Sequence, residues 1–215
     1  NARGEWLPDH PVELAPINAW PPKANVLLKW FAGFPGYLWP YNGLWLAITL
    51  ITWFFLTPPL AAMQSFEVWW LAWLLARNLA LITIVFGGLH AYFYILNKQG
   101  DELRFTTRGP IKKARRFLFG DQTHDNVFFT LASAVPVITL YEALTYWLFA
   151  NEYLGWFSLD GSPILFWAWF VALLLVAPFV HTFHFYFGHR LLHSPFLYRR
   201  FHALHHKNVE VGPWS

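Results

Sequence analysis

Histidines crowd one short part of this chain, and their spacing is that of metal ligands. Seven of the ten histidines fall within twenty-six residues. Five of them form two groups directly after an apolar stretch, with His189 and His193 in the first and His202, His205 and His206 in the second. Neutral imidazole is the commonest metal ligand among side chains, and residues three or four apart on a helix lie on one face. The two groups therefore predict a metal site.

Two earlier histidines, His181 and His184, lie three residues apart and about two turns before the first group. They are candidates for metal ligands or for groups that orient metal-bound rings, and the alternative is that they only pack between helices. For a single histidine, a surface or core role without metal is the ordinary interpretation, and we favour it for His90 and His124. For the double group that interpretation is disfavoured, because the ligand spacing occurs twice.

The composition places most of the chain outside water. It is 56% hydrophobic and 21% aromatic, with 13% charged residues, whereas soluble domains carry roughly 25% charged residues. We therefore expect an all-α integral membrane protein. The chain has no cysteine, which excludes thiolate metal sites, iron–sulfur clusters and disulfides. A site built from imidazole nitrogens suits iron, zinc, copper or nickel.

Prolines and apolar segments divide the chain into three regions. Residues 1–41 hold seven of the fifteen prolines and predict an extended arm, in which residues 23–31 form a short interfacial helix. Residues 42–187 predict a transmembrane domain, and residues 188–215 a histidine-rich, metal-binding cap that we expect to continue beyond residue 215. About 20 apolar residues cross a bilayer, which gives four expected spans at residues 45–63, 68–96, 127–150 and 163–187.

Basic residues set the expected orientation. Seven lysines and arginines lie in the loop 97–125 and four in residues 188–207, whereas the loops 64–66 and 151–162 contain none. By the positive-inside rule, the two basic segments face the cytoplasm. Both termini and the histidine groups are then expected on the cytoplasmic side of the membrane.

The basic loop carries a further predicted element. Residues 110–119 predict an amphipathic surface helix with proline in its first turn, suited to anionic lipid headgroups. The alternative is a basic flank without a specific ligand. Asp121 and Asp125 come just before the third span, and we expect them to cap that helix rather than to bind metal.

Polar and proline residues inside the spans give two more expectations. Pro136 predicts a kink in the third span. Arg77 and Glu142 are the only charges well inside the predicted spans, and they lie at similar expected depth. We therefore expect an intramembrane ion pair between them, away from the metal side.

Three motifs of the histidine region resemble a known superfamily. They are His189-Arg-Leu-Leu-His193, Ser194-Pro-x-Leu-Tyr198 and Phe201-His-x-Leu-His-His-Lys-Asn208. They are similar to motifs of the fatty acid hydroxylase/sterol desaturase superfamily, in its bacterial sterol desaturase branch. The runs at 117–122, 126–133 and 209–215 also resemble that branch, so the likeness covers residues 117–215.

The resemblance implies an integral membrane enzyme with two metal ions, usually iron, that uses O2 to hydroxylate or desaturate a lipid such as a fatty acyl chain or a sterol. It implies that His189, His193, His202, His205 and His206 are metal ligands. The superfamily normally carries a third histidine cluster, which would follow residue 215. Many members also have an acidic residue where Thr182 stands in this chain.

The expected function is therefore that of a membrane-bound, non-haem di-iron oxidoreductase acting with O2 on a lipid. No flavin, haem or nucleotide motif is visible, so we expect electrons from a partner such as a reductase, a ferredoxin or a cytochrome. Nucleic acid is not an expected partner. Two alternatives stay open: a non-catalytic, hydroxylase-like subunit of a larger membrane complex, and a zinc-dependent membrane hydrolase, although the His-Glu-x-x-His motif is absent.

Overall fold

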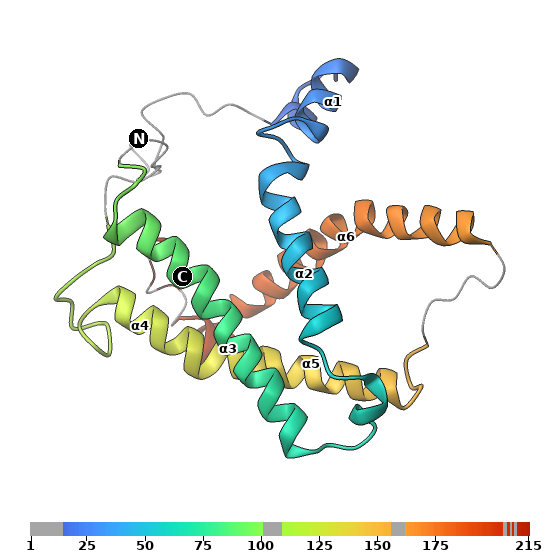
Figure 1. Cartoon of the computed structure of the whole chain (residues 1–215). Helices are drawn as coiled ribbons and strands as arrows, with labels where there is room; N and C mark the ends of the chain where they lie inside the picture. Colours follow the sequence, from blue (N-terminus) through green and yellow to red (C-terminus); the bar gives the residue numbers. More distant parts are fainter. Residues whose placement is uncertain (1–14, 101–108, 156–161, 204–205, 207, 209) are drawn as a thin grey trace.

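The computed structural model describes residues 15–100, 109–155, 162–203, 206, 208 and 210–215 (Figure 1). Over these residues the fold is all-helical, and the one extended pairing is an isolated bridge between Lys112 and Asp121. The predicted all-α class is confirmed for this part of the chain. Its helical elements are η1 (Pro16–Asn18), α1 (Ala24–Ala32), η2 (Leu38–Asn42), α2 (Gly43–Phe55), η3 (Leu60–Met63), α3 (Val68–His90), η4 (Ala91–Ile95), α4 (Gln122–Phe129), η5 (Thr130–Ala134), α5 (Val135–Ala150), α6 (Pro163–Leu192), α7 (Pro195–Leu197) and η6 (Tyr198–His202).

The short helix expected in the N-terminal arm is present as α1. Its last turn carries Trp30 and Phe31, whose rings lie 5.1 and 5.5 Å from the ring of Tyr37. The aromatic end of the helix is therefore held by the segment that follows it.

The first predicted span, residues 45–63, is wrong in length. The helix α2 has 13 residues and ends at Phe55, which corresponds to about 20 Å at 1.5 Å per residue. The cause is the pair Pro58 and Pro59, because proline has no N–H to donate and disfavours helical geometry in the residue before it. The chain re-forms only a 3-10 turn, η3, beyond them.

The second and third predicted spans are each one continuous helix. The first joins α3 and η4 over Val68–Ile95, 28 residues, and the second joins α4, η5 and α5 over Gln122–Ala150, 29 residues. Within the described residues, these two helices are long and apolar enough to cross a membrane, by length and composition.

Pro136 changes the hydrogen-bonding pattern of the second of these helices. The hydrogen bonding changes to the wider π pattern over η5, directly before α5, in which Pro136 occupies the first turn. Proline cannot donate to the carbonyl four residues earlier, that of Ala132. This carbonyl lies inside η5, and local widening of the helix is a usual response to a missing donor.

The helices α3 and α5 pack against each other and form the core (Figure 1). Met63, Trp70, Leu74 and Ala143 are buried together there. The Trp70 indole donates to the carbonyl of Ser65 at 3.0 Å, so the largest side chain of this core has its polar atom satisfied.

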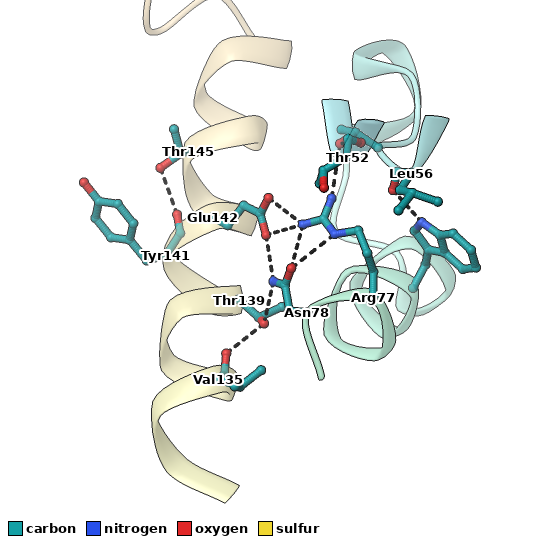
Figure 2. A network of polar contacts seen from close by, with 11 residues as sticks. Thr52, Leu56, Arg77, Asn78, Val135, Thr139, Tyr141, Glu142 and Thr145 are labelled. Atoms are coloured by element: carbon teal, nitrogen blue, oxygen red, sulfur yellow. Dashed lines mark hydrogen bonds and ion pairs between the residues drawn. The ribbon is translucent and has the colours of Figure 1, made fainter. Parts of the chain in front are cut away.

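One turn further along α3, a polar network crosses to α5 (Figure 2). The Arg77 Nη2 atom donates to both carboxylate oxygens of Glu142, at 2.6 and 2.5 Å. Asn78 donates to the same carboxylate at 2.8 Å and to the Thr139 hydroxyl at 3.0 Å, and Arg77 Nη1 donates to Thr57 at 3.1 Å. The predicted ion pair is confirmed, and it is part of a larger network that also fixes the end of α2.

The surface helix predicted at residues 110–119 is wrong. This segment folds as tight turns, with the Ala114 N–H donating to the Gly120 carbonyl at 3.0 Å. The backbone of Gly120 has φ +69°, a conformation that glycine adopts without strain. The buried Asp125 accepts from the Phe119 N–H at 3.0 Å, and the Phe117 side chain is buried. The contacts of residues 110–119 with the start of α4 therefore decide their backbone, and the amphipathic sequence pattern of this segment does not.

The helix α6 is 30 residues long, contains the fourth predicted span and ends at Leu192. The Ser162 hydroxyl accepts from the Leu165 N–H and caps its first turn. Helical structure resumes at Pro195, in α7, and continues through η6. Proline is favoured in the first turn of a helix, so Pro195 both limits α6 and begins the next helix.

Candidate metal centre

The first histidine pair lies at the C-terminal end of α6. His189 is in the last turn, and His193 is the residue that follows the helix. Because four residues make slightly more than one turn, both side chains lie on one face. Their Nε2 atoms are 3.1 Å apart, so the helix by itself brings two ligand atoms together.

A tight turn brings the second histidine group back onto the first. Ser194 has extended backbone angles, and the Tyr198 N–H donates to its carbonyl at 2.8 Å. This turn directs η6 past the end of α6. The ring of His202 then lies 4.7 Å from that of His189 and 4.8 Å from that of His193, measured between centroids.

His206 completes a group of four. Its ring centroid lies 4.6 Å from that of His202, 5.0 Å from that of His193 and 6.3 Å from that of His189. The four side chains offer one ligand nitrogen each, and these nitrogens all lie within 4.8 Å of one another. We call these four residues the histidine cluster.

The dimensions of the histidine cluster fit a metal ion. A metal–nitrogen bond of about 2.0–2.1 Å places neighbouring ligand nitrogens about 3.0–3.4 Å apart. The separation of 3.1 Å between His189 and His193 already meets this condition. The nitrogen-only donor set suits iron, zinc, copper or nickel.

The burial of the cluster is uneven. His202 is 6% exposed, whereas His193 and His206 are exposed and His189 is partly exposed. One side of the cluster therefore faces the protein and the other is open. The open side gives small molecules in solution access to the cluster.

The electrostatics of the cluster favour the neutral form of His193. Desolvation, and then the neighbouring His189 and His206 rings, lower the pKa of the His193 imidazole below its ordinary value. A lowered pKa keeps the ring neutral to lower pH, and only a neutral imidazole binds a metal ion.

Tyr198 stands beside the histidine cluster. Its ring centroid lies 5.7 Å from that of His193, 6.1 Å from that of His202 and 5.6 Å from that of His206. The sequence offered Tyr198 only as part of the Ser-Pro-x-Leu-Tyr motif. Its place on the first turn of η6, facing three ligand rings, is visible only once the turn at Ser194 is known.

The segment after the cluster is tied to α3 and α4, which sequence reasoning missed. Gln122, 1% exposed, donates to the Glu210 carbonyl at 2.7 Å and accepts from the Ile111 N–H at 3.1 Å. The buried Trp214 ring meets Phe86 edge-on, with centroids 6.0 Å apart. The signal that could have found this attachment is the position of Gln122, a buried polar residue at the start of an apolar helix.

The remaining candidate residues lie outside the cluster. His181 and His184 are exposed on α6, and His181 stacks on Phe185 at 6.2 Å; their role as ligands stays a prediction. His205 lies outside the described residues. His90 stacks on Tyr94 at 5.2 Å, and neither His90 nor His124 joins the cluster.

The two aspartates before the third span act differently from each other. Asp121 caps α4, because its carboxylate accepts from the N–H groups of Thr123 and His124, as predicted. Asp125 accepts instead from the Phe119 N–H, so it fixes the preceding loop.

Comparisons with protein-family models, curated proteins and solved structures found no match. The likeness to the hydroxylase/desaturase superfamily therefore rests on the histidine motifs and the neighbouring sequence runs alone.

Proposed function

We propose that this chain is a membrane-bound, non-haem iron oxidoreductase that acts with O2 on a lipid. The observation that carries the proposal is the histidine cluster, in which four imidazole nitrogens within 4.8 Å of one another lie at the end of a long apolar helix. Motif resemblance supports the choice of iron and of lipid oxidation over other chemistry at such a site, with zinc as the alternative metal.

The proposed topology has four membrane crossings with the histidine cluster on the cytoplasmic side. It is supported by two helices of spanning length and by α6, which has 30 residues. The short α2, with 13 residues, would cross together with the flanking η2 and η3 segments. The basic loop 97–125 and the basic residues after α6 support the orientation.

The chemistry divides between the metal and the chain. When bound, iron supplies the oxidising power toward a C–H bond that no side chain has. His189 and His193 would hold the ion from α6, and His202 and His206 would hold it from the returning segment. The exposed side of the cluster, at His193 and His206, leaves room for O2 to approach. The buried His202 is held in place by the surrounding protein.

A cavity of about 260 Å³ lies between α4, η5 and the segment after the cluster, and Phe201, the chain neighbour of His202, is one of its lining residues. Its lining is mixed, with the apolar Phe129 and Trp214 beside the polar Asp125, Asn126 and Asn208. It is therefore a candidate for an amphipathic part of a substrate. Acyl chains would reach it sideways from the bilayer, and electrons would come from a reductase, ferredoxin or cytochrome.

A second iron requires ligands beyond the histidine cluster. The four clustered nitrogens would hold one ion, and two-metal sites place their ions about 3.5–4 Å apart. Within this chain, His205, His184 and His181 are the proposed further donors. The di-iron form of the proposal thus makes a separate claim from the single cluster.

Substitution of individual histidines tests the proposal. His193→Ala and His205→Ala should each abolish bound metal and O2 uptake together, with purified full-length protein and added reductant. His124→Ala is the matched control, because His124 lies outside the cluster, and it should keep both. Retained metal and turnover in His193→Ala would remove that residue from the site, and the same result in His205→Ala would remove the fifth ligand.

A non-catalytic subunit is the second candidate function. It is favoured by the exposed apolar surface of α6, on which Ile164, Val180 and Phe183 are 80%, 60% and 68% exposed. Such a surface fits lipid or neighbouring membrane subunits. Recovery of this chain at fixed stoichiometry in a native complex, without metal, would favour this candidate over the enzyme.

A further inference from the structure

A second ligand-sized space lies within the membrane helices and contains none of the histidines. It is a cleft of about 390 Å³ between α2 and the packed pair α3 and α5. Small-molecule sites in proteins have volumes of about 300–1,000 Å³. We refer to it as the inner cleft; its lining residues include Trp45, Trp53, Ile82, Phe86, Ile138 and Tyr146.

The inner cleft is apolar along most of its length and polar at one end. Thr57, Asn78, Glu142 and Tyr146 all line it. The first three belong to the Arg77 network shown in Figure 2. Tyr146 lies one turn after Glu142 on α5 and lines the same cleft. A ligand with an apolar body and one polar end would match this distribution.

The charge at the polar end is already balanced. Arg77 and Glu142 form the ion pair, so a charged ligand group would add an uncompensated charge in a medium of low dielectric, which costs several kcal/mol. The polar end of the ligand should therefore be neutral.

The exposed groups of the polar end are mostly hydrogen-bond acceptors. The Glu142 side chain remains 24% exposed although it is paired, and a carboxylate accepts up to about four hydrogen bonds. The Thr57 hydroxyl donates to the Thr52 carbonyl at 2.9 Å and accepts from Arg77, whereas the Tyr146 hydroxyl can both donate and accept. A ligand hydroxyl satisfies both requirements, because it donates to the carboxylate and accepts from a neighbouring hydroxyl.

We infer that the inner cleft binds a neutral, hydroxyl-bearing lipid, a long-chain alcohol in chemical class, with its hydroxyl at the Arg77–Glu142 network. The bound lipid joins α2 to the α3–α5 pair, since the cleft is lined by all three helices. This site is separate from the histidine cluster, so occupancy does not depend on bound metal.

The test is photo-labelling of the purified, full-length protein in detergent with a long-chain alcohol that carries a diazirine in its chain. Labelled peptides from α2, α3 and α5 are quantified by mass spectrometry. Labelling should saturate, and unlabelled alcohol should compete at least about tenfold better than the alkane of equal length, because a hydrogen bond to a charged group is worth more than 1.4 kcal/mol. A fatty acid and an alkylamine of that length should not compete.

Two variants keep the test decisive. Ile138→Trp fills the inner cleft and should remove the saturable labelling, whereas Leu140→Trp on the same helix, outside the cleft and 68% exposed, should keep it. Tyr146→Phe should weaken the alcohol about threefold to tenfold without changing labelling by an alkane probe. Non-saturable labelling, equal labelling in both tryptophan variants, or better competition by the fatty acid would each overturn the inference, and chelation of metal should change none of these results.

Discussion

Substitution of Glu142 by glutamine tests whether the Arg77 network holds α3 and α5 together. The guanidinium is buried, with a side chain 3% exposed, and one of its nitrogens donates to both carboxylate oxygens. Glutamine replaces one of these acceptor oxygens by an NH2 group. That group would face two donors, Arg77 Nη2 and Asn78 Nδ2, and the arginine would lose its counter-charge.

The size of the effect follows from burial. Removal of one partner from a buried ion pair costs about 3–5 kcal/mol. The Glu142 side chain is 24% exposed, and Arg77 keeps acceptors on Thr57 and Asn78. We therefore expect the lower end, about 3 kcal/mol, which lowers the folding equilibrium constant about a hundredfold.

The assay is reversible unfolding in mixed micelles, followed by tryptophan fluorescence. Glu152→Gln is the control, because Glu152 is exposed in the loop after α5, and it should change stability by less than about 0.5 kcal/mol. The double variant Arg77→Met with Glu142→Met should lose less than the sum of the single variants, since neither charge is then left alone. A loss in Glu142→Gln no larger than that of the control would refute the structural role of the pair.

Three further predictions concern the segments that position the histidine cluster. Because the pKa of His193 is lowered in the folded chain, the unfolded chain binds more protons near and below pH 6.5. The stability of the metal-free protein and its affinity for metal should therefore both fall as the pH drops through that range. Unfolding and metal binding measured as a function of pH check this, and a flat profile would contradict it. Asp121→Ala should destabilise α4 by about 1 kcal/mol through loss of two accepted hydrogen bonds, with Asp121→Asn close to wild type in the same unfolding assay. Gln122→Leu should leave the Glu210 carbonyl without its donor and lower the free energy of unfolding by about 1–3 kcal/mol. It should also speed the loss of metal to a chelator. An unchanged rate of metal release would show that the C-terminal attachment does not support the site.

The sequence predicted the long helices and the ion pair because both follow from local rules. Apolar runs in residues 68–96 and 127–150 form helices wherever water is excluded. Arg77 and Glu142 had to find partners inside those runs. The same rules failed at residues 45–63, where Pro58 and Pro59 end the helix. A count of apolar residues predicts the length of a span, but it does not show where proline interrupts the helical hydrogen bonds.

Four of the predicted histidines, His189, His193, His202 and His206, lie together in the structure, but the geometry that joins them was not predictable from the sequence. The spacing of His189 and His193 fixes their approach on one helix. The approach of His202 depends on the turn at Ser194, and the attachment of the following segment depends on Gln122, 88 residues before its partner Glu210. Contacts at such separation leave no periodic trace in a sequence. The loop at 110–119 failed for the same reason, because its contacts with α4 decide its backbone.

Metal content per chain tests the central claim most directly. Elemental analysis of purified, full-length protein should find about two iron ions per chain if the site is a pair, together with O2 uptake on addition of reductant, and His202→Ala should lose both. About one iron per chain would keep the histidine cluster as the site and remove the second ion. A folded wild-type protein that binds no iron would contradict the account.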